Sequence, residues 1–126
     1  MSKVVIKGEL PSLNEYIRAE RANRYAAANL KKRYTALCSV YARASRNSGV
    51  EFSWPCKLKF TWYTKNNRKD ADNIAFAKKF VLDGFIKAGI LGNDNRKHIT
   101  GFQDEFVVDK RNPRVEIDEI TEDEDA

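Results

Sequence analysis

Three aspartates in a basic stretch are the residues of this sequence best suited to chemistry. Asp70 and Asp72 lie two positions apart, directly after Arg68 and Lys69, and Asp94 follows some twenty positions downstream. Carboxylates held within a few ångströms repel one another unless a proton or a cation neutralises them. The pattern therefore predicts either a metal site or acids that decorate the start of a helix.

If the three carboxylates converge, they offer hard oxygen ligands without a nearby histidine or cysteine. Such a set favours Mg²⁺ or Mn²⁺ over zinc or copper. The ion would lower the pKa of a bound water and offset the charge that develops on a phosphoryl group. Lys79 lies seven residues after Asp72, nearly two helical turns, so both project from one face of a continuous helix. A lysine there can contact a scissile phosphate or protonate a leaving oxygen.

A structural interpretation of the same acids stays open. Asp70 and Asp72 can be first-turn acids favoured by the helix dipole, and Asp94 can be an Asx-turn residue. Convergence also requires a bend before Asp94, because eighteen residues of straight helix span about 27 Å. In the helix that follows Asp72, Lys78 is expected at the surface and Asp83 is expected to pair with Lys87, four residues on.

The charge distribution predicts a polyanionic partner. The chain has 23 lysines and arginines against 18 acids, and seven of those acids lie from Glu116 onward, so the preceding body is strongly basic. Phosphate contacts of such a body release counterions, which favours nucleic acid. The alternative is that these charges only keep a small domain soluble.

Hydrophobic periodicity predicts the elements that must position these residues. Strands are expected over 3–7, 57–65, 97–109 and 113–120. A helix is expected over 15–46 with a break within 23–29, so the part after the break starts at about 26. A second helix is expected over 71–88. The fold is an α/β (α+β) fold: a small mixed sheet of about four strands packed with two main helices, in the order β-α-β-α-β-β.

Particular residues carry this assignment. Asn14 is a candidate cap of the first helix, Gly89 a candidate C-terminal residue of the second, and Gly101 a candidate bulge. The interior glycine Gly84 costs the second helix about 1 kcal/mol relative to alanine. The apolar stripe of the first helix consists of Leu30, Tyr34, Leu37, Tyr41 and Ala44. The strand over 57–65 alternates between apolar Leu58, Phe60 and Trp62 and an outer face of Lys57, Lys59, Thr61, Tyr63 and Lys65.

Composition excludes several other classes of protein. There is no apolar run near the roughly 18 residues that a membrane span requires, and residues 1–10 lack the apolar core of a secretory signal. We therefore expect a cytoplasmic protein without a membrane partner. Cys38 and Cys56 form no metal-binding motif and His98 is the only histidine, which argues against zinc and for reduced thiols.

Several segments together resemble the RusA family of Holliday junction resolvases. The opening Gly8-Glu9-Leu10-Pro11-Ser12-Leu13-Asn14 is similar to the family's Gly-x-x-Pro-Ser-x-Asn. The stretch from Arg68 to Ile74 is similar to its basic-basic-Asp-x-Asp-Asn-aliphatic signature. Lys79, the run Asp83-Gly84-Phe85, Asp94 and the last strand from Pro113 to Ile117 also resemble the family in order and spacing.

The resemblance implies a homodimeric, magnesium-dependent endonuclease that cuts two strands of a four-way DNA junction symmetrically, with no small-molecule cofactor. Residues 1–120 would form one RusA-like nuclease domain, and we expect the acidic tail 121–126 to be disordered. Asp70, Asp72 and Asp94 would be the catalytic metal ligands, with Mn²⁺ able to replace Mg²⁺, and Lys79 the catalytic lysine. The basic pattern and the two motifs place the DNA contacts at Asn14, Lys57, Lys59, Lys65, Arg68, Lys69 and Asn73.

Two hypotheses from other classes compete with this one. The first is a protein that binds DNA junctions but has lost cleavage, and the second is a scaffold domain whose basic charge serves only solubility. They differ in a simple observation, because the first binds junctions without cutting them and the second shows no salt-sensitive DNA binding.

Overall fold

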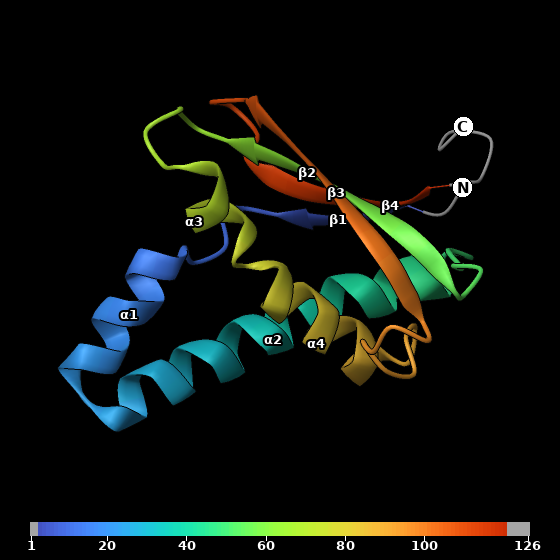
Figure 1. Cartoon of the computed structure of the whole chain (residues 1–126), viewed down its shortest axis with the longest axis horizontal. Helices are drawn as coiled ribbons and strands as arrows, with labels where there is room; N and C mark the ends of the chain where they lie inside the picture. The colour runs from blue at the N-terminus through green and yellow to red at the C-terminus, as the bar shows by residue number, and fades with distance from the viewer. Residues whose placement is uncertain (1–2, 121–126) are drawn as a thin grey trace.

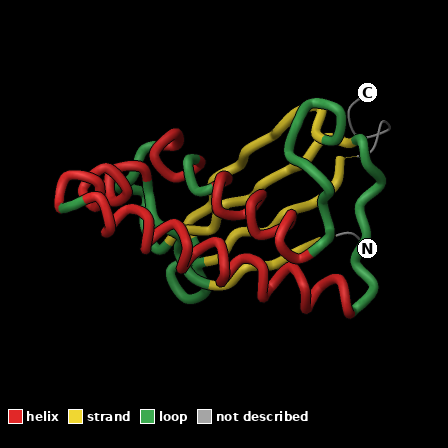
Figure 2. Tube along the Cα trace, turned by 90° about the horizontal axis from the view of Figure 1, so that it is seen from below, coloured by secondary structure: helices red, strands yellow, loops and turns green. Residues whose placement is uncertain are grey.

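Within residues 3–120, which are those that the structure describes, four strands form one mixed sheet and the helices cover one of its faces (Figures 1 and 2). The structure is a computed structural model. Its elements in chain order are β1 Lys3–Lys7, α1 Leu13–Ala22, α2 Arg24–Asn47, β2 Cys56–Thr64, α3 Ala71–Ala75, α4 Lys78–Ala88, β3 Ile99–Val108 and β4 Arg114–Ile120. This confirms the expected α+β fold. The expected tail over 121–126 lies outside the described residues.

The strand order in the sheet is β1-β4-β2-β3. β4 is antiparallel to both of its neighbours, whereas β2 and β3 are parallel. Parallel neighbours need a crossover connection, and α3 and α4 supply it. Cys56 pairs with Ile99 but Lys57 pairs with Gly101, so the ladder has an irregularity beside Gly101, as its sequence predicted.

Alternation along the strands produces the core. The inward side chains of β2, at Leu58, Phe60 and Trp62, are buried, as the sequence predicted. They pack in one cluster with α2 and α4, to which Phe80 and Phe85 contribute their rings. Because one face of the sheet meets helices and the other meets solvent, a period of two is the expected pattern for these strands.

The first long helix is broken at Asn23, inside the range expected for a break. Asn23 adopts an extended conformation and its side chain accepts hydrogen bonds from the backbone N–H groups of Tyr25 and Ala26, so it caps α2. One expectation for this region was wrong and another holds in part. Ser12, not Asn14, caps α1, because its hydroxyl accepts the N–H of Glu15. Of the stripe expected along α2, Leu30, Tyr34 and Tyr41 pack against the core, but Ala44 is exposed and the fully buried positions are those of Ala27, Cys38 and Ala42.

The second helix is also divided, which corrects the expectation of one helix over 71–88. α3 ends at Ala75, and the N–H of Ala77 donates to the carbonyl of Ile74 at 3.1 Å in a tighter turn. The ring of Phe76 lies in this turn, 5.4 Å from Tyr16 and 5.8 Å from Phe80 between ring centroids. α4 then ends at Gly89, whose φ of 79° confirms the predicted C-terminal glycine.

Candidate nucleic-acid and metal site

A hollow of about 500 Å³ brings together the two motifs that are remote in the sequence. The backbone N–H of Asn14 donates a hydrogen bond to Oδ1 of Asn73 at 2.9 Å, and this joins the start of α1 to α3. The lining residues are Ser12, Asn14, Glu15, Arg18, Arg68, Lys69, Asp70 and Asn73. Five of the residues predicted for the site, Asn14, Arg68, Lys69, Asp70 and Asn73, therefore line one surface.

Hydrogen bonds at the start of α1 fix the positions of several residues that line this hollow. Ser12 and Glu15 form a reciprocal pair: the Glu15 N–H donates to the Ser12 hydroxyl, which in turn donates to a Glu15 carboxylate oxygen at 3.1 Å. Lys69 donates to the same Glu15 carboxylate at 2.9 Å. Burial alone would raise the pKa of Glu15, but the bonds from Lys69 and Ser12 outweigh it and hold that pKa below its usual value of 4.5.

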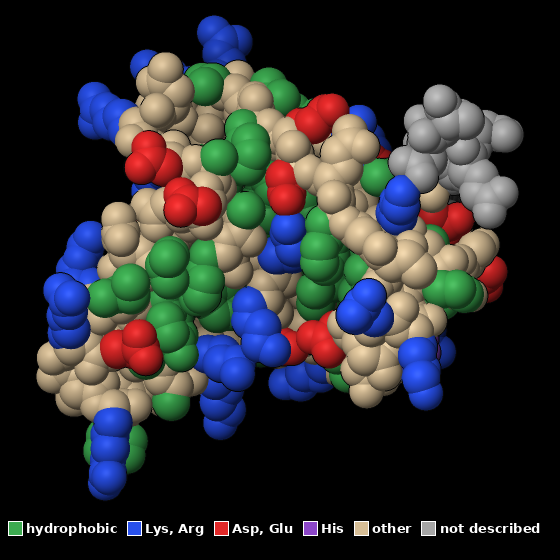
Figure 3. Space-filling model, viewed as in Figure 1, with side chains coloured by type: hydrophobic (Ala, Val, Ile, Leu, Met, Phe, Trp, Pro, Cys, Tyr) green, Lys and Arg blue, Asp and Glu red, His purple; other side chains and the backbone are tan. Residues whose placement is uncertain are grey.

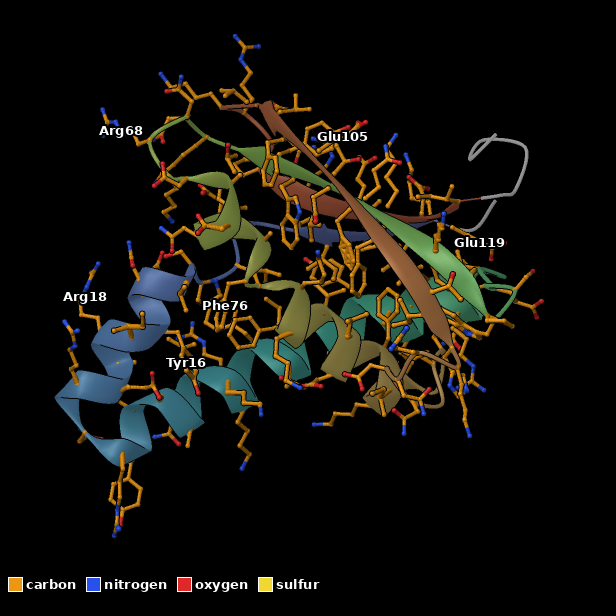
Figure 4. All side chains as sticks on the ribbon, viewed as in Figure 1. Tyr16, Arg18, Arg68, Phe76, Glu105 and Glu119 are labelled. Atoms are coloured by element: carbon orange, nitrogen blue, oxygen red, sulfur yellow. The ribbon has the colours of Figure 1, made fainter. Side chains whose placement is uncertain are left out.

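Arg68 and Arg18 form the open rim of the hollow. In Figure 4 both side chains extend from the left side of the molecule, Arg68 from the loop before α3 and Arg18 from α1. Neither guanidinium is paired with an acid within residues 3–120. In Figure 3 blue side chains gather along this margin. Arg18 was not among the predicted site residues, because only the tertiary contact between α1 and α3 places it beside Asp70.

Asp70 and Asp72 are exposed and unpaired among the described residues. Asp70 occupies the position before α3 but makes no side-chain capping bond, and α3 is only five residues long. A helix of that length offers little dipole to stabilise acids, so the purely structural interpretation of the pair loses support. Lys69, the nearest cation in the sequence, is bonded to Glu15.

Asp94 does not join Asp70 and Asp72 within this chain. No group of three or more acidic, histidine or cysteine side chains able to hold a metal occurs in residues 3–120. The register of β2 and β3 explains this: Asp94 precedes Ile99 at the first paired position, whereas Asp70 follows Thr64 at the last. Eight residue steps along a strand measure about 26 Å. Figure 1 places the loop before β3 and the segment around α3 at opposite ends of the sheet.

The turn around Asp94 does not use its carboxylate. Oδ1 of Asn93 accepts the N–H of Asn95, and Oδ1 of Asn95 accepts the N–H of Lys97. These two asparagines make the Asx turns. Asp94 itself is exposed and bonds to no other described residue, so the expectation of an Asx-turn role for it was wrong.

The neighbouring lysines of α4 differ from what the sequence suggested. Lys78, expected at the surface, is largely buried and donates to Asp104 at 2.7 Å, with its Nζ 4.3 Å from the centroid of the Phe102 ring. Lys79 is exposed and lies 3.4 Å from Asp83. The expected pair between Asp83 and Lys87 is therefore replaced by one with Lys79. The break before α4 also removes the continuous helix on which the shared face of Asp72 and Lys79 depended.

The predicted basic face of β2 carries compensating acids. Lys59 lies 3.5 Å from Glu105 on β3. The ring of Tyr63 is covered by the Arg114 guanidinium at 3.7 Å, and that guanidinium is bonded to Glu116. Lys57 shares this face, whereas Lys65 is exposed just beyond the strand. The positive charge of this face is thus partly offset, whereas Arg18 and Arg68 at the hollow have no acidic partner within residues 3–120.

No family model matches the chain, and no curated protein matches it.

No helix within the described residues is both long enough and apolar enough to cross a membrane.

Proposed function

We propose that this protein is a Mg²⁺-dependent endonuclease of the RusA kind, selective for branched DNA, that resolves four-way (Holliday) junctions by paired phosphodiester hydrolysis in recombination and repair. The observation that carries the proposal is the contact of Asn14 with Asn73, which sets the unpaired carboxylate of Asp70 beside a basic rim. Cations of the rim attract phosphates, while carboxylates repel them unless a metal ion intervenes. Because its proposed substrate is DNA, we place the protein in the cytoplasm.

Asp70 and Asp72 fit the acidic part of an oxygen-only site, since both are exposed and neither is neutralised by another described residue. They would hold Mg²⁺, or Mn²⁺ in its place, with Asp94 as a third ligand. When bound, the ion supplies an activated water and offsets phosphoryl charge. Arg18 and Arg68 hold the phosphodiester at the rim, Lys69 orients Glu15, and Lys79 is the proposed proton donor to the leaving oxygen.

The proposed homodimer finds support in β3. This strand forms an edge of the sheet within the described residues, and Phe102, Phe106, Val107 and Val108 on it are exposed. It contains no lysine and no proline, the residues that usually protect an open edge from pairing. We propose that β3 pairs with β3 of a second copy about a two-fold axis, which requires the two strands to be antiparallel.

Antiparallel pairing of two β3 strands would bring Asp94 of one copy to the site that lacks a third carboxylate in the single chain. It sets the Ile99 end of one β3 against the Val108 end of the other, so the loop that carries Asp94 in one copy approaches Asp70 and Asp72 of its partner. Two composite sites then face a two-fold substrate, as paired incisions require. On this proposal the monomer holds only part of each site.

A junction-cleavage assay tests the activity. We expect wild type to nick a synthetic four-way junction in Mg²⁺ or Mn²⁺ and to lose this activity when a chelator is added. Asp72→Asn should reduce cleavage by about 100-fold or more while still binding the junction, because only the metal ligand is lost. Equal and negligible cleavage by both proteins would overturn the enzyme proposal.

Co-expression of two inactive variants tests the composite site. In a mixed dimer of Asp72→Asn with Asp94→Asn, the composite arrangement leaves one site intact, so the junction is cut in one strand. If each chain builds its own site, both sites of the mixed dimer are defective and no cut appears. Each variant alone serves as the matched control.

One observation favours a second candidate function, a junction-binding protein without cleavage. Within residues 3–120 a single chain gathers no three-acid metal group. If the dimer also fails to complete the site, the basic hollow would bind junctions while no metal supports cutting. Tight, salt-sensitive binding together with unchanged junction strands in Mg²⁺ and Mn²⁺ would select this alternative.

A further inference from the structure

The corner between α1 and α2 projects beyond the sheet and ends in an exposed tyrosine. In Figure 1 the two helices meet at the end of the molecule remote from the strands. Asn23 is the single residue between them, and its side chain accepts the N–H groups of Tyr25 at 3.0 Å and Ala26 at 2.8 Å. The corner is therefore held by hydrogen bonds and presents Tyr25 in a defined direction.

Tyr25 has the largest exposed fraction, 64%, among the large hydrophobic side chains of the described residues. Arg24 accompanies it: the guanidinium carbon lies 5.0 Å from the ring centroid, and a guanidinium N–H donates to the tyrosine hydroxyl at 2.9 Å. Arg24 thus limits the freedom of the ring while most of the ring surface stays open. An aromatic side chain that is held but not packed is suited to stack on a flat partner.

Arginines connect this tip to the candidate site. Arg18 lines the hollow beside Asp70, and Arg21 and Arg24 follow at intervals of three residues. None of the three is paired with an acid among residues 3–120. Of the two acids in α1, Glu15 is bonded to Lys69 and only Glu20 is without a cation partner in that range. Positive charge therefore continues from the hollow to the tip.

Arg18, Arg21 and Arg24 form a basic track, and the length of α1 determines how far this track extends. Ten helical residues span about 15 Å, which equals four or five steps of a stacked nucleic-acid strand at about 3.4 Å each. A strand whose phosphate lies in the hollow would reach the tip within a few nucleotides. The partner that fits a basic track with an aromatic end is a nucleic-acid strand with an unstacked base.

We propose that Tyr25, held by Arg24, stacks on a base at the branch point of DNA, while Arg18 and Arg21 contact phosphates of the strand that leads to the carboxylates. This inference rests on the proposed action on branched DNA and adds the element that distinguishes a branch from a continuous duplex. Phosphate contacts alone bind any duplex, whereas a stacking residue favours a site where a base has lost its neighbour.

The test compares Tyr25→Ala and Tyr25→Phe with wild type on a junction that carries 2-aminopurine at the branch, and on a linear duplex of the same length. Tyr25→Ala should bind the junction about 5- to 100-fold more weakly and lose the fluorescence change of 2-aminopurine, with the duplex affinity changed less than about twofold. Tyr25→Phe should stay within about twofold of wild type on both. Val40→Ala, at another exposed hydrophobic residue of α2, is the matched control.

The outcomes separate this inference from the proposed function. If wild type binds the junction in a salt-sensitive manner and Tyr25→Ala binds it equally well, the stacking role is wrong and the proposed function stands. If Tyr25→Ala instead changes the oligomeric state in sedimentation, Tyr25 belongs to a protein interface and the inference is overturned. Absence of any DNA binding by wild type overturns both, and circular dichroism establishes that each variant is folded.

Discussion

The backbone N–H of Asn14 lies 2.9 Å from Oδ1 of Asn73, and this contact joins two motifs that are 59 positions apart in the chain. The first N–H groups of a helix have no partner within the helix. Asn73 supplies one to α1, and Ser12 supplies another through its hydroxyl. The same contact draws Arg18 and Asp70 to one surface, so the start of α1 serves both stability and the candidate site.

We expect Asn73→Ala to destabilise the fold by about 0.5–1.5 kcal/mol, because it leaves the Asn14 N–H without its partner at a partly solvated position. Junction cleavage should fall by more than this loss of stability explains, since the hollow loses its fixed geometry. Denaturant unfolding and cleavage at saturating DNA measure the two effects. Asn73→Asp, which keeps an acceptor oxygen, should retain most of the stability.

Replacing Glu15 should alter the pH dependence of stability. The folded-state pKa of Glu15 is lowered, so its contribution is present above its unfolded pKa near 4.5 and is lost as the pH falls through the lower folded value. Wild type should exceed Glu15→Gln by at most about 1 kcal/mol at pH 7, since Lys69 and Glu15 are both partly exposed. Urea unfolding from pH 7 to pH 3 should show this difference shrinking, and a constant difference would contradict the assignment.

Gly84→Ala should destabilise the protein although alanine favours helices. An added Cβ at Gly84 would lie 2.6 Å from Cβ of Cys38 and 2.9 Å from the backbone N of Ser39. The gain in helix propensity is about 1 kcal/mol, and the clash between α4 and α2 costs more, so we expect a net loss of about 1–3 kcal/mol. Thermal unfolding measures it. Gly92→Ala is the control, because its nearest contact would be His98 Nε2 at an ordinary 3.5 Å.

Substitutions of the two adjacent lysines of α4 should have different effects, one on stability and the other on cleavage. Lys78→Met removes the partner of Asp104, which also accepts a hydrogen bond from Trp62 Nε1, and should lower the free energy of unfolding by about 1–3 kcal/mol. Lys79→Met breaks only an exposed contact with Asp83 and should change stability by less than about 0.5 kcal/mol. On the proposed function it should nevertheless abolish most cleavage. Wild-type cleavage by a folded Lys79→Met would remove Lys79 from the site.

A charge on the exposed side of β3 should dissociate the proposed dimer. Phe106 is 40% exposed on this edge strand, and Phe106→Lys introduces the type of residue that blocks pairing of edges. We expect a monomer in sedimentation, with cleavage lost and unfolding little changed. Val40→Lys, at another exposed hydrophobic position, should leave the oligomeric state unaltered. A dimer that persists in Phe106→Lys would place the interface elsewhere.

Much of the fold was predictable from local patterns. Alternation predicted the buried face of β2 at Leu58, Phe60 and Trp62, and the glycine at position 89 predicted the end of α4. These features depend on a few neighbouring residues: a half-buried strand has period two, and a left-handed helix end favours glycine. The basic body and the placement of Asp70 and Asp72 at the start of a helix also follow from local sequence.

Only the tertiary structure decided how these parts meet. Periodicity does not reveal that Phe76 lies in a turn between two helices or that Gly84 allows α4 to approach α2. It also does not reveal that Lys78 is much less exposed than Lys79. Nor does it give the parallel register of β2 and β3, which sets Asp94 at the far end of the sheet from Asp70. The physical reason is that the sequence pattern reports how each element divides between core and solvent, whereas pairing order and helix breaks arise from contacts between distant segments.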